Sequence, residues 1–160
     1  MNLLPPITDN VSELLTEIVV FTQTRQRILI QNVSDLDEPG FVPKDLAVEE
    51  FSDLLNHAIA EHIQNQRLVL RDTENIKFGA NGGLQLKPVA DEHAQVLLGQ
   101  NRDQYIELQI NKLLENSLNQ RVAAQLLRHK QCAMHEYEQP AEGGQISAQE
   151  LPICWDKTQE

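Results

Sequence analysis

The feature that constrains this chain most is a long helical pattern near its start, which stops at a Pro-Gly pair. Between Asn10 and Asp35, residues that return to one helix face follow one another at alternating steps of three and four. This is the spacing of a coiled-coil seam. The sequence therefore predicts a helix over about 10–35 that packs against a second helix. The expected seam residues are Val11, Leu14, Ile18, Phe21, Arg25, Ile28 and Asn32.

Two of these seam residues are polar, Arg25 and Asn32, and both lie in the second half of the predicted helix. A long polar side chain can extend along the helix edge to reach water. A polar seam residue can instead set the register, because it finds a partner in only one alignment. Both interpretations stay open for Asn32.

The predicted helix ends at Pro39-Gly40. Proline disfavours a helical conformation in the residue before it, and glycine supplies the positive φ of a sharp exit. Phe41 gives this turn an apolar anchor, and Asp45 is placed to cap a second helix over about 46–65. The expected apolar face of that helix is Phe51, Leu54, Leu55, Ala58, Ile59 and Ile63.

The middle of the chain, residues 66–100, has a different pattern. Residues 67–72 alternate weakly, as in a short strand. Two short alternating runs flank Asn81-Gly82, a strong turn signal, so we expect a hairpin or irregular loop over 76–89. Residues 91–100 are expected to hold a helical turn.

A last long helix is predicted over about 103–131. Its apolar residues recur every four positions, and each step of four turns the row by about 40° around the helix. One flat neighbour cannot cover such a row, so we expect contacts with more than one neighbour, which is a physical indication of assembly. The row is Ile106, Ile110, Leu114, Leu118, Val122 and Leu126, with Leu113 and Leu127 beside it.

The expected fold is mainly α. Long N- and C-terminal helices form a coiled-coil-like pair, accompanied by a short amphipathic helix and a small hairpin or irregular region. One domain is expected over 1–131. Residues 132–160 contain Pro140, Gly143-Gly144 and Pro152 without sustained periodicity and are expected to be a flexible tail. Within that tail, residues 153–155 are a small apolar patch that could dock.

Composition narrows the function classes. The net charge of −11 disfavours nucleic-acid binding, which needs an excess of Lys and Arg. No apolar run approaches the roughly 20 residues of a membrane helix. The first residues lack the basic and apolar regions of a cleaved secretory signal, which by itself indicates a cytosolic protein.

Three groups of residues could carry chemistry, and each has a simpler interpretation. His57, Glu61 and His62 share one helix and could bind a metal, but a zinc site needs three or four ligands, and no partner motif follows. A solvated helix face is the default. Gly79, Gly82 and Gly83 lack the Lys-Ser/Thr of a phosphate loop, so a turn explains them better.

Cys132 and His135 have a CxxxH spacing to which Cys154 could add a third ligand. A metal site or a disulfide is an alternative here, and two incidental thiols are the simpler expectation. We found no nucleophile with a matched histidine and acid. The sequence thus predicts no enzyme, no cofactor and no metal.

The stretch around the Pro-Gly break resembles a signature of flagellar axial proteins, above all the proximal rod proteins of the bacterial flagellar basal body. In that signature a helix ends in R-x-x-(I/V)-L-x-x-N-(I/V)-A-N and is followed by T-P-G-Y and a later Asp. The chain departs from it at Ser34, Asp35, Glu38 and Phe41. The matching residues are Arg25, Ile28, Leu29, Asn32, Val33, Pro39, Gly40 and Asp45.

The last predicted helix resembles the C-terminal helix of the same family, V-D-L-D-x-E-M-x-x-L-x-x-N-x-x-x-Y-x-A-x-x-Q-L-L. Gln109 stands where Glu is usual, and Gln120 stands at the Tyr position. The matching residues are Ile106, Glu107, Ile110, Leu113, Asn116, Ala123 or Ala124, Gln125, Leu126 and Leu127.

This resemblance implies a rod-type axial domain over 1–131 and a structural subunit of the flagellar rod. Such subunits assemble helically with themselves, with other rod subunits and with the export-gate junction protein, and they transmit motor torque across the periplasm. They leave through the flagellar export channel without a cleaved signal. The alternative is an acidic helical adaptor or export-chaperone-like cytosolic protein. A small metal-dependent enzyme using His57 and Glu61 is a third interpretation.

Overall fold

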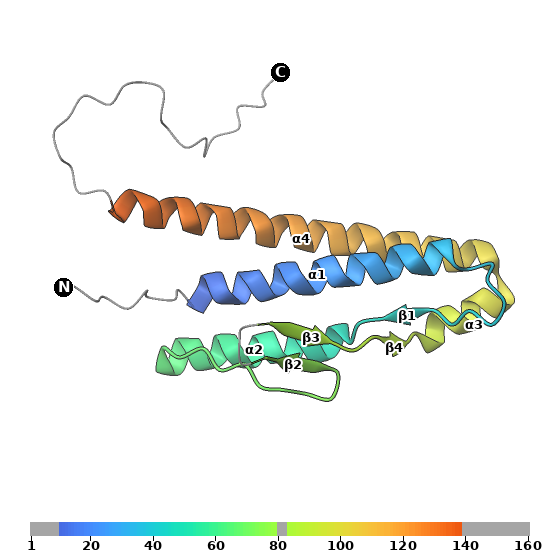
Figure 1. The fold of residues 1–160 in the computed structure, drawn as a ribbon, viewed down its shortest axis with the longest axis horizontal. Coiled ribbons are helices and arrows are strands. Elements are labelled where there is room, and N and C mark those ends of the chain that lie inside the picture. The colour runs from blue at the N-terminus through green and yellow to red at the C-terminus, as the bar shows by residue number, and fades with distance from the viewer. Residues whose placement is uncertain (1–9, 80–82, 139–160) are drawn as a thin grey trace, which may run out of the picture.

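The computed structural model describes residues 10–79 and 83–138. Within these ranges the chain is mainly helical, with a long first helix and a longer last helix side by side (Figure 1). The helices are α1 (Asn10–Ser34), α2 (Val48–Asn65), α3 (Glu92–Gln100) and α4 (Arg102–Glu138). The strands are β1 (Lys44–Asp45), β2 (Ile76–Phe78), β3 (Leu84–Leu86) and β4 (Val89–Ala90).

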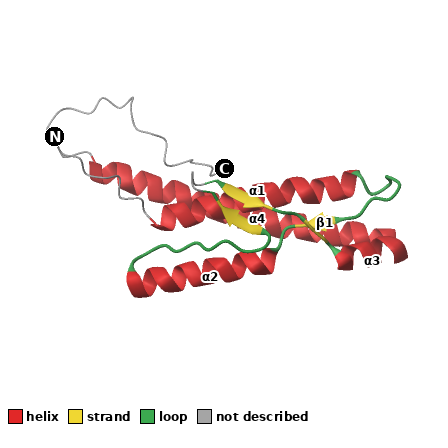
Figure 2. Ribbon diagram, turned by 60° about the horizontal axis from the view of Figure 1, so that its bottom comes forward, coloured by secondary structure: helices red, strands yellow, loops and turns green. Residues whose placement is uncertain are grey.

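Helix α1 occupies the middle of the molecule. Helix α4 runs antiparallel to it on one side, and α2 with the β2–β3 hairpin lies on the other side (Figures 1 and 2). The first turn of α1 and the last turns of α4 therefore lie at the same end of the molecule. The predicted packing of the two long helices against each other is confirmed, because α4 packs on α1.

Within the described part of the chain, four short strands make two separate antiparallel pairs. In one pair β2 and β3 form a hairpin with Ile76 opposite Leu86 and Phe78 opposite Leu84. In the other, β1 pairs with β4 and places Lys44 opposite Ala90. The second pair holds the segment that leaves α1 against the segment that leads into α3.

The hydrophobic core lies between α1, α2 and the hairpin rather than between α1 and α4. Phe21 of α1 and Phe51 of α2 stack with ring centroids 3.9 Å apart. Around this stack Leu46, Leu54 and Ile76 are buried. Ile18 and Ile28 from the predicted seam pack against the same core, so the seam residues of α1 are divided between two neighbours.

Local interactions explain where the helices begin and end. Gly40 has φ +77°, as the exit from α1 requires. The Asp91 side chain accepts a hydrogen bond from the Ala94 amide and caps α3. The Asn101 side chain accepts from the amides of Asp103 and Gln104 and caps α4. Gln66 ends α2 in the left-handed region at φ 54°.

Most predicted elements are present, with shifted bounds. The helices expected over 10–35 and 46–65 are α1 and α2, and the hairpin expected over 76–89 contains β2 and β3. The helical turn expected over 91–100 is the helix α3. The turn residues Asn81 and Gly82 lie outside the described residues.

Three local predictions were wrong. Helix α4 continues past Gln131 to Glu138, so the start of the expected tail is helical. Residues 67–72 form no strand, because no neighbouring backbone pairs with them. Asp45 does not cap α2; Ala47 holds that position without a side-chain bond, and the Asp45 carboxylate is engaged elsewhere. The remainder of the expected tail, from 139 onward, lies outside the described residues.

Candidate functional site

The carboxylate of Asp45 forms a buried ion pair with Arg25 that joins α1 to β1. Arg25 Nε donates to Oδ1 at 2.8 Å and Nη2 donates to Oδ2 at 3.0 Å, a bidentate geometry. Arg25 is only 5% exposed and Asp45 7%. Both residues belong to the rod-like signature, and their positions show that Arg25 is not extended along the helix edge into water.

Lys112 of α4 extends this ion pair to the other long helix. Its ammonium group donates to Asp45 Oδ2 at 2.9 Å and to Asp91 Oδ2 at 2.5 Å. Burial pushes the pKa of Asp45 upward, but the bonds and charges of Arg25 and Lys112 outweigh burial and hold that pKa below its usual range. For the ammonium group of Lys112, burial alone would lower the pKa. The hydrogen bonds and charges of Asp91 and Asp45 outweigh burial and raise that pKa. The four groups together connect α1, β1, α3 and α4.

Asn32 is the centre of a second polar contact, toward the end of α1. Its Nδ2 donates to the Lys44 carbonyl at 2.7 Å and to Gln109 Oε1 at 3.0 Å, and its Oδ1 accepts from the Lys44 amide at 3.1 Å. The Tyr105 hydroxyl donates to the Asn32 carbonyl at 2.8 Å, and burial raises the pKa of Tyr105 to about 12. Asn32 is 2% exposed, so it does not reach water. This geometry favours register setting over extension to the helix edge.

A third polar contact follows further along the same line of α4. Asn116 Nδ2 donates to the Thr22 carbonyl at 2.8 Å, and Asn116 is 1% exposed. Ala123 is buried one heptad later. The fully buried residues of α4 are therefore mostly polar or small. Together with the half-buried Lys112 they are Tyr105, Gln109, Lys112, Asn116 and Ala123, which we call the polar seam.

Two buried polar atoms have no hydrogen-bond partner among the described residues, Glu17 Oε2 and Gln109 Nε2. Burial, and then the charge of Glu13, raises the pKa of Glu17. Glu17 is 7% exposed. These are local costs to stability within an otherwise satisfied polar arrangement.

The apolar row predicted on α4 faces away from this seam. Ile110 is 47% exposed, Leu114 65%, Leu118 62%, Val122 47% and Leu126 50%. A helix that turned its apolar row inward would bury these side chains against α1, and α4 does the reverse. The row is the largest set of exposed aliphatic side chains on any one described element.

An open groove runs between α1, α2 and α4 beside the end of this row. Its volume is about 440 Å³, and Val122 and Leu126 of α4 form part of its wall. From α1 and α2 come Ile18, Val48 and Leu55. We call it the three-helix groove. Its lining is largely apolar, so it offers a hydrophobic contact surface rather than a reaction site.

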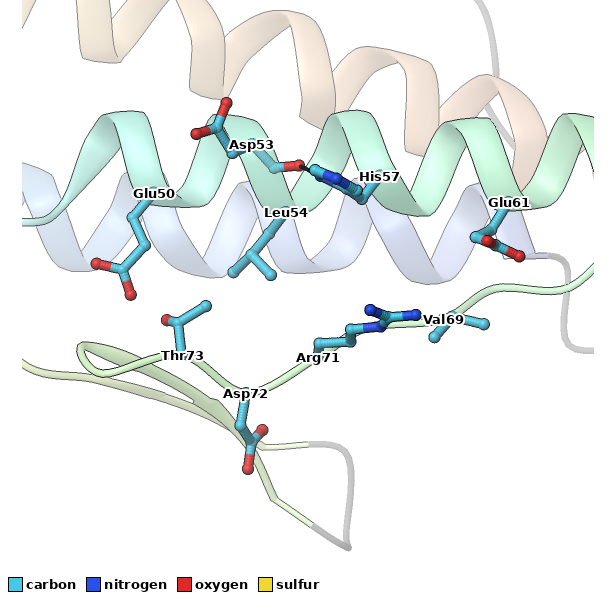
Figure 3. A pocket seen from close by; sticks show the side chains of 9 residues that line it. All are labelled: Glu50, Asp53, Leu54, His57, Glu61, Val69, Arg71, Asp72 and Thr73. Carbon is cyan, nitrogen blue, oxygen red and sulfur yellow. Dashed lines mark hydrogen bonds between the residues drawn. The ribbon is translucent and has the colours of Figure 1, made fainter.

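A second cavity, of about 420 Å³, lies between α2 and residues 69–73 (Figure 3). Figure 3 shows Leu54 pointing from α2 toward residues 69–73. The Arg71 side chain lies along that segment. The pKa of Glu50 is lowered by hydrogen bonds from Thr73 and Asn75. The cavity is therefore lined by side chains that connect α2 to the hairpin.

Two of the three residues predicted as an alternative metal site, His57 and Glu61, also line this cavity, and both are hydrogen-bonded within α2. His57 Nδ1 pairs with the Asp53 carbonyl at 2.8 Å, and Glu61 accepts from Asn65. His62 Nδ1 is hydrogen-bonded to Nδ2 of the Asn10 side chain at 3.2 Å. Among the residues that the structure describes, no three His, Cys, Asp or Glu side chains gather as a metal site would require.

The other chemistry candidates are also accounted for where the structure describes them. The Gly79 amide donates to the Gly83 carbonyl within the hairpin, whereas Gly82 lies outside the described residues. Cys132 is disulfide-bonded and so is not an incidental thiol as expected. The side chains of His135 and Cys154 lie outside what the structure describes. No helix among the described residues is long and apolar enough to cross a membrane.

The polar residues of the two rod-like signatures are buried with specific partners, whereas much of the apolar set is exposed or half-buried. Arg25 bonds to Asp45, Asn32 to Gln109, and Asn116 to the Thr22 carbonyl. Pro39 and Gly40 are exposed at the turn after α1, and Phe41 is half-buried. Val11, Leu14, Ile106, Leu113 and Leu127 are half-buried, and Gln125 is exposed.

Sequence reasoning missed the roles of Tyr105, Lys112 and Asp91. A signal for them existed, because Tyr105, Gln109, Lys112 and Asn116 follow one another at steps of four, three and four. That is seam spacing, but the stronger apolar row on the same helix masked it.

Comparisons of the chain with protein-family models, curated proteins and solved structures found no match.

Proposed function

We propose that this chain is a structural subunit of the bacterial flagellar basal-body rod, which assembles helically with itself and with other rod proteins to transmit motor torque. The proposal rests on the two resemblances in the sequence and on one structural observation above all. Asn32 of the first signature donates to Gln109 in the region of the second, 77 residues away, at 3.0 Å. The two signatures are thus parts of one contact, as expected of segments that specify one helix pair.

The proposed mechanism is burial of apolar surface. Each fully buried Leu or Ile side chain stabilises a contact by roughly 1.5–3 kcal/mol relative to exposure. The five exposed residues of the α4 row supply such surface, and neighbouring subunits would cover it. The polar seam keeps α4 in one register on α1, so the row is presented in a fixed orientation.

Localisation in the periplasmic rod, export without a cleaved signal and contact with the export-gate junction protein belong to the same proposal. They follow from the resemblance. A tagged chain that expresses and complements its own deletion should be detected by immunogold labelling in purified basal bodies, below the hook.

The direct test is deletion of the gene in its own cell, followed by electron microscopy of basal bodies. A rod subunit predicts loss of rod and hook, restored by the intact chain. Normal flagella in the deletion strain, with no second copy of a similar gene, would contradict the proposal.

The second candidate is an acidic helical adaptor or export-chaperone-like protein. The net charge of −11 and the apolar three-helix groove favour it, since an amphipathic segment of a client could occupy the groove. An adaptor would leave basal bodies that lack one exported client, and the chain itself would be absent from them. The labelling experiment separates the two candidates.

A further inference from the structure

The exposed row of α4 divides into two parts that face different directions. Each step of four residues turns by about 40°, so Leu126 is rotated by about 120° from Leu114. Val122 and Leu126 line the three-helix groove, whereas Ile110, Leu114 and Leu118 do not. We call these last three residues the α4 ridge.

The α4 ridge lies on the side of the helix opposite α1. Leu114 and the buried Asn116 are two residues, or about 200°, apart on the helix. A chain cannot place this ridge into its own groove, because helix α4 itself lies between the two surfaces. Any molecule that covers both surfaces of one chain must therefore do so from outside.

Charges near the two surfaces are complementary. Arg121 lies three residues after Leu118 and seven after Leu114, so it shares the face of the ridge. Glu115 lines the three-helix groove and is exposed. Arg128 follows Arg121 by two turns on the ridge side. A helix that enters the groove with Arg121 beside Glu115 would satisfy both charges at the rim.

We propose that the α4 ridge of one copy of this chain packs into the three-helix groove of a second copy. The ridge supplies apolar side chains on a helix, and the groove, about 440 Å³ in volume, is bounded by three helices that such side chains can contact. The occupant is a second copy because the same chain carries the complementary ridge with its arginine.

The contact joins two different surfaces and is therefore heterologous. Such contacts propagate head to tail and produce rings or open helical assemblies, unlike a two-fold contact that stops at a dimer. The inference deepens the proposed function and rests on it, since it names the contact through which copies would assemble. It nevertheless depends on the geometry of this chain and can fail separately.

The test uses one variant for each surface. Leu114→Asp damages the ridge at a side chain that is 65% exposed. Ser52→Arg fills the groove from an exposed position on its wall. Circular dichroism must show unchanged helicity for both. Self-association is measured by sedimentation velocity over a concentration series in about 0.15 M salt, which screens the repulsion between acidic copies.

We expect the full chain to form species larger than dimers as concentration rises. Each variant alone should weaken association by roughly tenfold or more. An equimolar mixture of the two should form a one-to-one dimer that does not grow, because the intact ridge of one fits the intact groove of the other. The charge swap Arg121→Glu with Glu115→Arg should restore association that Arg121→Glu alone weakens.

Three results would overturn the inference. They are a chain that stays monomeric at its highest soluble concentration, an unchanged Ser52→Arg variant, and a mixture that behaves like either variant alone. An unchanged Ser52→Arg together with a monomeric Leu114→Asp would indicate a two-fold contact between ridges instead. None of these results bears on the rod assignment, which is tested by deletion of the gene.

Discussion

Single residues decide the stability of this molecule through the buried charges around Asp45. Arg25 of α1 and Lys112 of α4 both pair with that carboxylate, and Lys112 also pairs with Asp91, the N-cap residue of α3. Removing one partner from a buried ion pair leaves the other charge uncompensated, which is more costly than the pair was favourable.

We therefore expect Asp45→Asn to lower the free energy of unfolding by about 3 kcal/mol. Urea titration followed by circular dichroism measures it. The matched control is Asp37→Asn, which breaks the exposed ion pair with Arg102 and should change nothing measurable. Equal effects of the two substitutions would contradict the importance given to the buried pair.

The ion pair of Arg25 and Asp45 also makes the free energy of unfolding depend on pH in the acid range. The pKa of Asp45 is lower in the folded chain than in the unfolded chain, so its contribution is present above about pH 4 and is lost as pH falls through the folded-state pKa. Urea titrations at decreasing pH should show the intact chain losing stability more steeply than Asp45→Asn below about pH 4. Parallel curves would contradict this.

The contribution of Glu17 to stability depends on pH in the opposite direction. Its pKa is raised in the folded chain, so the charged form destabilises the fold, and stability is lost as pH rises from the unfolded-state pKa through the folded-state pKa. Glu17→Gln should raise the free energy of unfolding at pH 7 by about 1 kcal/mol. The gain should vanish at acid pH, where the glutamate is protonated. A loss of stability at pH 7 would indicate a partner for Glu17 that we have missed.

At the scale of elements, the polar seam determines how α4 sits on α1. Asn32 satisfies both backbone groups of Lys44 and contacts Gln109, so it fixes α1 to β1 and α4 at once. Asn32→Leu has similar volume but leaves these groups unpaired. We expect it to cost about 2 kcal/mol and to broaden the amide spectrum of α4, as alternative registers become populated.

Asn116→Leu is the comparison for this prediction, because the Asn116 side chain donates to the Thr22 carbonyl, a group in the interior of helix α1. It should cost less than Asn32→Leu and leave one set of α4 signals. If both variants keep a single register with equal stability, the seam does not set the register.

The sequence predicted the helices and the hairpin far better than it predicted the contacts between them. Periodicity, the Pro39-Gly40 exit and the hairpin signal each act within a few residues, so they predicted α1, α2 and the hairpin. Which face of α4 meets α1 is not a local property. The row at steps of four resembles a core, yet Leu114 is 65% exposed, while Gln109 and Asn116 are buried. Only partners such as the Lys44 backbone and Thr22, supplied by distant residues, make those polar positions suitable for burial.

The sequence predicted the burial of the polar candidate residues better than that of the apolar ones, because burial depends on partners that are distant in the sequence. Arg25, Asn32 and Asn116 were expected on the seam or in the signatures, and each has a specific buried partner. Ile110 and Leu118 were expected to pack, but no described neighbour in one chain covers them. Sequence patterns cannot distinguish an apolar face that is buried within a chain from one that is buried between chains.

At the scale of the whole molecule, the chain has a core on one side of α1 and an exposed apolar row on α4, of which the ridge lies opposite α1 and the rest lies beside the three-helix groove. If the row is an assembly surface, the dilute monomer should protect its amides unevenly. We expect slow hydrogen exchange near Asn32 and Tyr105, and fast exchange toward the first turns of α1 and the last turns of α4. Equally strong protection along both helices of a dilute monomer would argue against ordering on assembly.

The most direct test of the central claim is a complementation experiment. The deletion strain would carry Leu118→Asp with Leu126→Asp. Its matched control would carry Ser117→Asp with Gln131→Glu, which adds the same charge at two exposed positions of α4 outside both signatures and outside the apolar row. Both proteins must accumulate to equal levels. We predict rods and motility with the control and neither with the leucine variant. Rods and motility restored equally by both variants would contradict the claim that the exposed row of α4 is an assembly surface.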